Sequence, residues 1–75
     1  MVDLDTLRQR ITPEQRAVVN CLWEGFRDHD RWPSRQEVQA RTGEAALRAA
    51  QAALGEAVLR EGSEDGVPDC RLTFL

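Results

Sequence analysis

A short stretch near the middle of the chain constrains the fold most, because one helix must stop there and another must start within two residues. Ser34-Arg35-Gln36-Glu37 has the pattern of a capping box and predicts a short helix ending at about Arg41. Thr42-Gly43 ends that helix, since glycine suits the left-handed position that follows a helix C-terminus. An alanine-rich helix is expected next, over about 44–55. The sequence therefore predicts two helices joined by a tight turn.

Two further helices are predicted before this pair. Thr12-Pro13-Glu14-Gln15 combines an N-cap threonine, a proline suited to the first helical position and a glutamine at the capping-box position. Apolar side chains then recur with helical spacing, so an amphipathic helix is expected from about Pro13 to about Asp28: Val18, Leu22, Phe26. A shorter helix, capped by Asp3 or Asp5, is indicated by one apolar stripe near the N-terminus: Leu4, Leu7, Ile11.

The corner between the second and third predicted helices is polar. We expect 27–31 to form a solvated loop, which ends where Pro33 favours extended backbone at Trp32. Trp32 has two interpretations, a platform for stacking a base or a cover over the end of the neighbouring helix. The second is the commoner use of a tryptophan at such a corner.

The C-terminal part of the chain predicts a β-hairpin. Val58–Glu61 is a short apolar-to-polar run, 62–68 has turn chemistry throughout, and Cys70–Leu75 alternates with a period of two. That alternation places three apolar residues on one face, namely Cys70, Leu72 and Phe74. The fold class is therefore mainly α with a small β-hairpin. The core is expected to contain Val18, Leu22, Phe26, Val38, Leu47, Leu54, Leu59, Leu72 and Phe74.

Composition narrows the class of protein. Seventy-five residues suffice for one domain, and 41% hydrophobic with 31% charged residues is typical of a globular chain. No apolar run is long enough to span a bilayer, and the acidic N-terminus does not resemble a signal peptide, so we expect a cytoplasmic protein without a membrane partner. The net charge is −3, which does not favour general attraction to phosphates.

Candidate reactive residues are few. Cys21 and Cys70 each lie in an apolar run, so we expect two buried, reduced thiols rather than a disulfide or redox pair. With His29 as the single histidine, no short-spaced ligand set for a metal is present. No Ser/His/Asp arrangement or phosphate-binding glycine loop is evident either. We therefore predict no cofactor, no metal and no enzymatic activity.

The order of elements resembles the winged helix-turn-helix family. The residues that carry the resemblance run from Trp32 to Gly43, an aromatic-Pro-Ser entry followed by a Thr-Gly turn, and Arg71-Leu72-Thr73 resembles the closing wing strand. The resemblance implies a winged helix-turn-helix domain over 12–75, with a three-helix core plus a wing. The short N-terminal helix over 1–11, predicted from its apolar stripe, is expected to pack on that core. It also implies DNA binding of the transcription-regulator type. In that family the third helix enters the major groove, while the second helix and the wing contact phosphates.

The residues can be tested against that role. At 100° per residue, the third helix presents an outward face of Ala45, Arg48, Ala49 and Ala52, and an inward face of Leu47, Ala50, Gln51 and Leu54. Arg48 could read a guanine, and alanines could touch a thymine methyl. Phosphate contacts are expected from Arg35, Arg41, Arg60 and Arg71. The alternative for these arginines is ordinary surface ion pairing, such as Glu37 with Arg41 at i, i+4.

A second function fits the same surface. Small side chains let another helix approach closely, so Ala45, Ala49 and Ala52 could form a docking stripe for a second subunit, giving a homodimer, or for another domain. The chain stops within its last predicted strand, so we expect an N-terminal domain of a larger multidomain protein. Double-stranded DNA and a protein partner thus remain alternative partners of the third helix.

Overall fold

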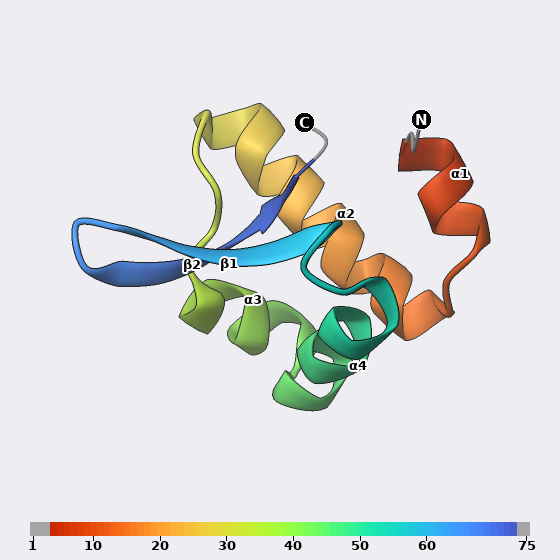
Figure 1. The fold of residues 1–75 in the computed structure, drawn as a ribbon. Coiled ribbons are helices and arrows are strands. Elements are labelled where there is room, and N and C mark those ends of the chain that lie inside the picture. Colours follow the sequence, from red (N-terminus) through yellow and green to blue (C-terminus); the bar gives the residue numbers. More distant parts are fainter. Residues whose placement is uncertain (1–3, 74–75) are drawn as a thin grey trace.

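The structure is a computed structural model that describes residues 4–73. These residues form four helices followed by a two-stranded antiparallel hairpin (Figure 1). The elements are α1 (Leu4–Gln9), α2 (Pro13–His29), α3 (Arg35–Thr42), α4 (Glu44–Leu54), β1 (Leu59–Glu64) and β2 (Val67–Leu72). The predicted fold class, mainly helical with a small hairpin, is confirmed, and none of these helices is long and apolar enough to cross a membrane.

The longest helix, α2, begins as the sequence predicts. The Thr12 hydroxyl accepts a hydrogen bond from the Gln15 backbone N–H, and the Gln15 side chain accepts one from the Thr12 N–H, both at 3.2 Å. The C-terminal end differs from the prediction. Residues 27–29, expected in a loop, are helical, and Asp30 ends the helix in the left-handed conformation, its N–H donating to the Phe26 carbonyl. Aspartate tolerates that conformation better than most residues, so one polar residue suffices as the stop.

The tight turn between α3 and α4 is a single residue, Gly43. Its φ of 91° is positive, as predicted, but its ψ of 149° lies outside the left-handed helical region. The chain is therefore extended at this residue, in a conformation open essentially to glycine alone. At the start of α3, the Ser34 hydroxyl accepts from the Glu37 N–H at 3.1 Å, which is the hydroxyl half of the predicted capping box.

The hairpin is longer and its loop shorter than the sequence indicates. The strands run through most of 62–68, the segment expected to be a loop, and only Asp65 and Gly66 form the turn. Both have positive φ, 53° and 80°, as a two-residue type I′ turn requires. On its other side β2 pairs with the segment before α3, through a bridge between Ser34 and Asp69. The hairpin is thereby attached to the helical part at one edge.

The core lies where α2, α3 and α4 meet the base of the hairpin (Figure 1). Six of the nine residues predicted for it are buried: Val18, Leu22, Val38, Leu47, Leu59 and Leu72. Phe26 and Leu54 are half-buried only, because each lies near the C-terminal end of its helix, and Phe74 lies outside the described residues. The other buried apolar residues of the core are Leu7, Val19, Cys21, Ala46, Ala50 and Cys70.

Aromatic packing and one glycine fix the corner before α3. The Trp32 and Phe26 rings stack with centroids 4.4 Å apart, so Trp32 covers the end of α2 as the commoner interpretation predicts. Gly25, within α2, lets the chain approach closely, since a Cβ there would lie 3.1 Å from the Pro33 ring. The sequence alone presents Gly25 as a local weakness of the helix, whereas its role is to admit Pro33.

The short helix α1 is held against α2 by polar groups as well as by Leu7, which is buried. The Arg16 guanidinium donates to the carbonyl of Arg8, in the last turn of α1, at 3.1 Å, and to that of Ile11, just after the helix, at 3.5 Å. The last carbonyls of a helix have no partner within it, so the bond to Arg8 supplies one. Arg8 in turn donates to the Asn20 side chain at 2.8 Å. These bonds explain how a helix of six residues is maintained.

Candidate functional site

The outward face of α4 is the surface on which both predicted functions depend. Its side chains lie as the helical period indicates: Ala45, Arg48 and Ala52 are exposed, and Ala49 is half-buried. The opposite face packs into the core through Leu47 and Ala50. The surface therefore consists of small side chains around one long cation.

Arg48 is bound to a carboxylate on its own helix. Its guanidinium lies 2.9 Å from Glu44, one turn earlier, and the two side chains are 71% and 56% exposed. Such a pair is worth little in free energy because water competes for both groups. It nevertheless places a negative charge beside the one side chain on this face suited to reading a base.

A second cation, Arg35, belongs to a network that joins three elements. Glu61 of β1 accepts from the Arg35 side chain at the start of α3 and, at 2.9 Å, from the Gln51 side chain of α4. Gln51 was expected on the inward face, and it lies at the rim, where it reaches the hairpin. Nothing in the sequence indicates this network, since its members are separated by 10 and 26 positions.

The third cation, Arg71, is held by the most buried carboxylate of the described residues. Its guanidinium donates to both oxygens of Asp69, at 2.9 and 3.1 Å, and to the Ser63 carbonyl at 3.3 Å. The bond to Asp69 raises the pKa of Arg71. Gly62 makes the room, because a Cβ there would lie 2.7 Å from the Arg71 Nε. The predicted phosphate ligand is therefore already engaged.

Arg41 and Arg60 complete the predicted set. Arg41 lies 3.6 Å from Glu24 of α2, and not with Glu37, the i, i+4 partner that the sequence suggested. Arg60 is exposed and forms no ion pair within residues 4–73. Of the five predicted arginines, four are thus paired with carboxylates, which agrees with surface ion pairing as their role in the free protein.

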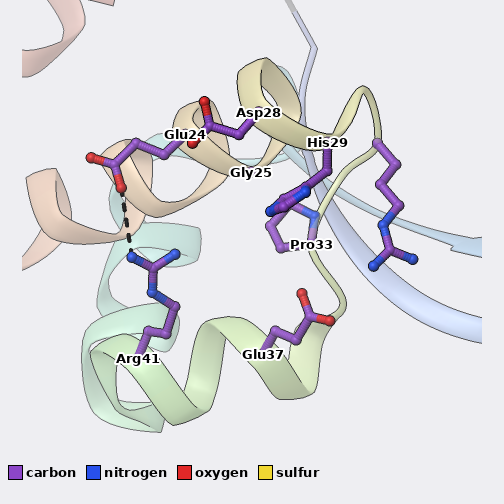
Figure 2. Close-up of a pocket in the computed structure, with 8 residues that line it drawn as sticks. Glu24, Gly25, Asp28, His29, Pro33, Glu37 and Arg41 are labelled. Carbon is purple, nitrogen blue, oxygen red and sulfur yellow. Dashed lines mark ion pairs between the residues drawn. The ribbon is translucent and has the colours of Figure 1, made fainter.

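A polar pocket of about 210 Å³ lies between the C-terminal half of α2 and α3 (Figure 2). Figure 2 shows Glu24 and Arg41 paired across its opening and Glu37 facing it from α3. Both members of the pair are about half exposed, so the pocket is a solvated recess with compensating charges. His29 lines it without any hydrogen bond to a carboxylate within the described residues.

The two cysteines are free and buried, as the sequence predicts. Burial raises the pKa of both thiols, that of Cys70 to about 11. A thiol with so high a pKa carries almost no thiolate near neutral pH and is chemically inert. Within residues 4–73, no group of three or more His, Cys, Asp or Glu side chains has an arrangement that could hold a metal ion.

Comparison with known proteins adds no relative: no family model, curated protein or solved structure matches the chain.

Proposed function

We propose that the chain is a winged helix-turn-helix module that docks onto another protein through the outward face of α4, the first partner to consider being a second copy of the chain. In this proposal α3 and α4 form the helix-turn-helix and the hairpin is the wing. The observation that carries the proposal is the pairing of the arginines on this side of the molecule with carboxylates.

The charge balance supports a protein partner over DNA. The segment from α3 to the end of the hairpin, 35–72, has five arginines and seven carboxylates, a net charge of −2: Glu37, Glu44, Glu56, Glu61, Glu64, Asp65 and Asp69. The hairpin tip, which a DNA-binding wing would place near phosphates, carries Glu64 and Asp65 and no cation. A surface that binds duplex DNA is expected to be basic, because phosphate contacts supply most of the attraction.

The shape of the α4 face also suits docking. Ala45 and Ala52 are exposed and leave the helix backbone close to the surface, where a second helix can approach. Glu44 and Arg48 add charges of both signs at the rim, so two copies related by a twofold axis could pair unlike charges.

Duplex DNA is the second candidate, and one specific observation favours it. The single-residue turn at Gly43 leaves α4 exposed along its outer face with Arg48 projecting from it, as a recognition helix requires. Surface ion pairs are weak enough for Arg48 to leave Glu44 when a better partner is present.

Sedimentation of the wild type and of Ala49→Arg tests the leading proposal. The wild type should self-associate at concentrations up to about 1 mM, where even weak interfaces are populated. Ala49→Arg, and Ala52→Arg at the more exposed position, should abolish association by steric clash. Ala17→Arg, the same change on the exposed side of α2, should not.

A wild type that stays monomeric would remove the second copy as partner. A salt titration on a pool of duplexes tests the second candidate in parallel. Binding that weakens steeply with salt, and with Arg48→Ala, would favour DNA over docking.

A further inference from the structure

The outer face of the hairpin forms, with the corner before α3, a groove of about 320 Å³ that contains none of the outward α4 residues; we call it the hairpin groove. Its apolar lining is Trp32 and Val67. Among the described residues Val67 is the large apolar side chain left exposed, at 54%. Trp32 is half-buried, and Phe26 stacks on one face of its ring. Apolar surface is thus open to solvent at this place.

Carboxylates surround this apolar surface. Glu64 and Asp65 lie at the hairpin tip and Glu37 on α3, and none of the three forms a hydrogen bond or ion pair with an arginine side chain within residues 4–73. Glu64 is close enough to Arg71 for its charge to help raise the pKa of Arg71. Glu44 on α4 and Glu61 on β1, by contrast, are each paired with an arginine. Asp69 also lines the groove but is satisfied by Arg71. Arg31 is the single cation of the lining, so the groove is negative overall.

The register explains how these groups share one face. Glu64 lies directly opposite Val67, and Gly62 opposite Asp69, so all four are on the outer face of the hairpin. Gly62 adds no side chain between them. The bridge between Ser34 and Asp69 then fixes the corner with Trp32 alongside.

We propose that the hairpin groove binds a basic, extended segment of a partner protein, with an arginine or lysine side chain lying over Val67 and Trp32 and its cationic end among the unpaired carboxylates. Long basic side chains bury an aliphatic stem while their charge stays in water, which matches an apolar floor with an acidic rim. A guanidinium is also attracted to the face of an indole ring. Phosphate groups of a nucleic acid would meet the same carboxylates with like charge.

The test uses two short synthetic peptides, acetyl-Gly-Arg-Leu-Arg-Gly-amide and the same peptide with citrulline, a neutral isostere, in place of both arginines. Titration into the isotopically labelled chain is followed by NMR chemical shifts. The arginine peptide should shift the signals of the Trp32 indole N–H and of the backbone amides of 64–67 and Asp69. The citrulline peptide should bind at least about 3-fold more weakly, since each rim charge contributes modestly.

Variants distinguish binding in the hairpin groove from general attraction of a basic peptide to an acidic protein. Val67→Ser and the double change Glu64→Gln/Asp65→Asn should each weaken binding of the arginine peptide at least about 3-fold without unfolding the exposed tip. Glu56→Gln, which removes a carboxylate outside the groove, should leave binding unchanged. Equal binding of both peptides, an equal loss with Glu56→Gln, or shifts of the groove residues on addition of a short DNA duplex would each overturn the proposal. Absence of any shift with the arginine peptide would do so too. Sedimentation of Ala49→Arg tests the proposed docking through α4 independently, so the two proposals can fail separately.

Discussion

The base and the tip of the hairpin differ sharply in the burial of their side chains. At the base, Leu59 and Leu72 lie opposite each other and both are buried in the core. At the tip, five pairs further along the same ladder, Glu64 and Val67 lie opposite each other and both are exposed. Backbone pairing is continuous from one end to the other, so the difference is in the side chains alone. The base contributes to stability, and the tip is free to carry function.

The largest expected effect on stability comes from truncating a core side chain at the base of the hairpin. Leu72→Ala should lower the free energy of unfolding by about 2–5 kcal/mol, because it leaves a cavity among fully buried neighbours. Val67→Ala at the tip should change it by less than about 0.5 kcal/mol. Urea denaturation of both variants measures the two values. Similar losses at the two positions would show that the tip is packed and the comparison is wrong.

Cys70, on the core face of β2 near the base, should be protected from alkylation. With its pKa raised from 9.0 to about 11, the thiolate population near neutral pH should fall about 100-fold, and burial should slow the reaction further. Iodoacetamide labelling followed by mass spectrometry should modify Cys70 only when urea unfolds the chain.

The raised pKa of Cys70 also makes the free energy of unfolding depend on pH. Below pH 9 the thiol is protonated in both the folded and the unfolded chain, so it contributes nothing to pH dependence. Between pH 9 and about 11 the unfolded chain loses this proton first, so stability should fall as pH rises. A free energy of unfolding that increases over this range would contradict the burial of Cys70.

Gly62, midway along β1, lies between the buried base and the exposed tip, and its substitution should have an intermediate effect on stability. In Gly62→Ala the new Cβ would meet the Arg71 side chain and displace it from Asp69. The loss of a partner for a buried carboxylate should cost about 1–3 kcal/mol. Asp69→Asn in the Gly62→Ala background should recover part of this loss, because the amide has no charge to leave unpaired. No recovery in the double variant would mean that strand strain, and not the carboxylate, causes the loss.

The smallest effect belongs to the turn. Gly66→Ala should cost about 1–2 kcal/mol at most, because a positive φ disfavours an L-residue while nothing lies near the new Cβ. Asp65→Gly, at the other positive φ of the turn, should stay within about 0.5 kcal/mol of the wild type. Thermal unfolding of both proteins is a sufficient measurement, and a larger loss for Asp65→Gly would assign the aspartate side chain a contact at the tip.

Local signals in the sequence were enough to predict the helices. The hydrogen bonds that begin and end the helices join residues only three or four positions apart, as at Thr12, Ser34 and Gly43. Such caps can therefore be recognised in the sequence without knowing the fold. The hairpin was predicted with a loop that is too long, because Gly62, Ser63 and Pro68 are turn-forming residues by composition. Their pairing with β2 and β1 depends on partners that the core positions.

The candidate site was less accessible to such signals. The periodicity of α4 identified which residues face outward, but the partners of the arginines could not be predicted. Glu61 meets Arg35, and Glu24 meets Arg41, through contacts between different elements. Charge composition gives the total of cations and anions, while their pairing depends on the tertiary arrangement. The groove at Trp32 and Val67 was missed for the same reason.

The two-residue turn at Asp65 and Gly66 also limits how this hairpin can change in length. An insertion that keeps this two-residue turn has to lengthen the ladder itself. One more residue in each strand would move the tip outward by about 3.3 Å. It would also turn the side chains on the tip side of the insertion to the opposite face of the hairpin. Two more in each strand would restore the facing and extend the reach by about 6.6 Å. Longer forms of this hairpin that keep its outer face are therefore expected to grow in steps of four residues.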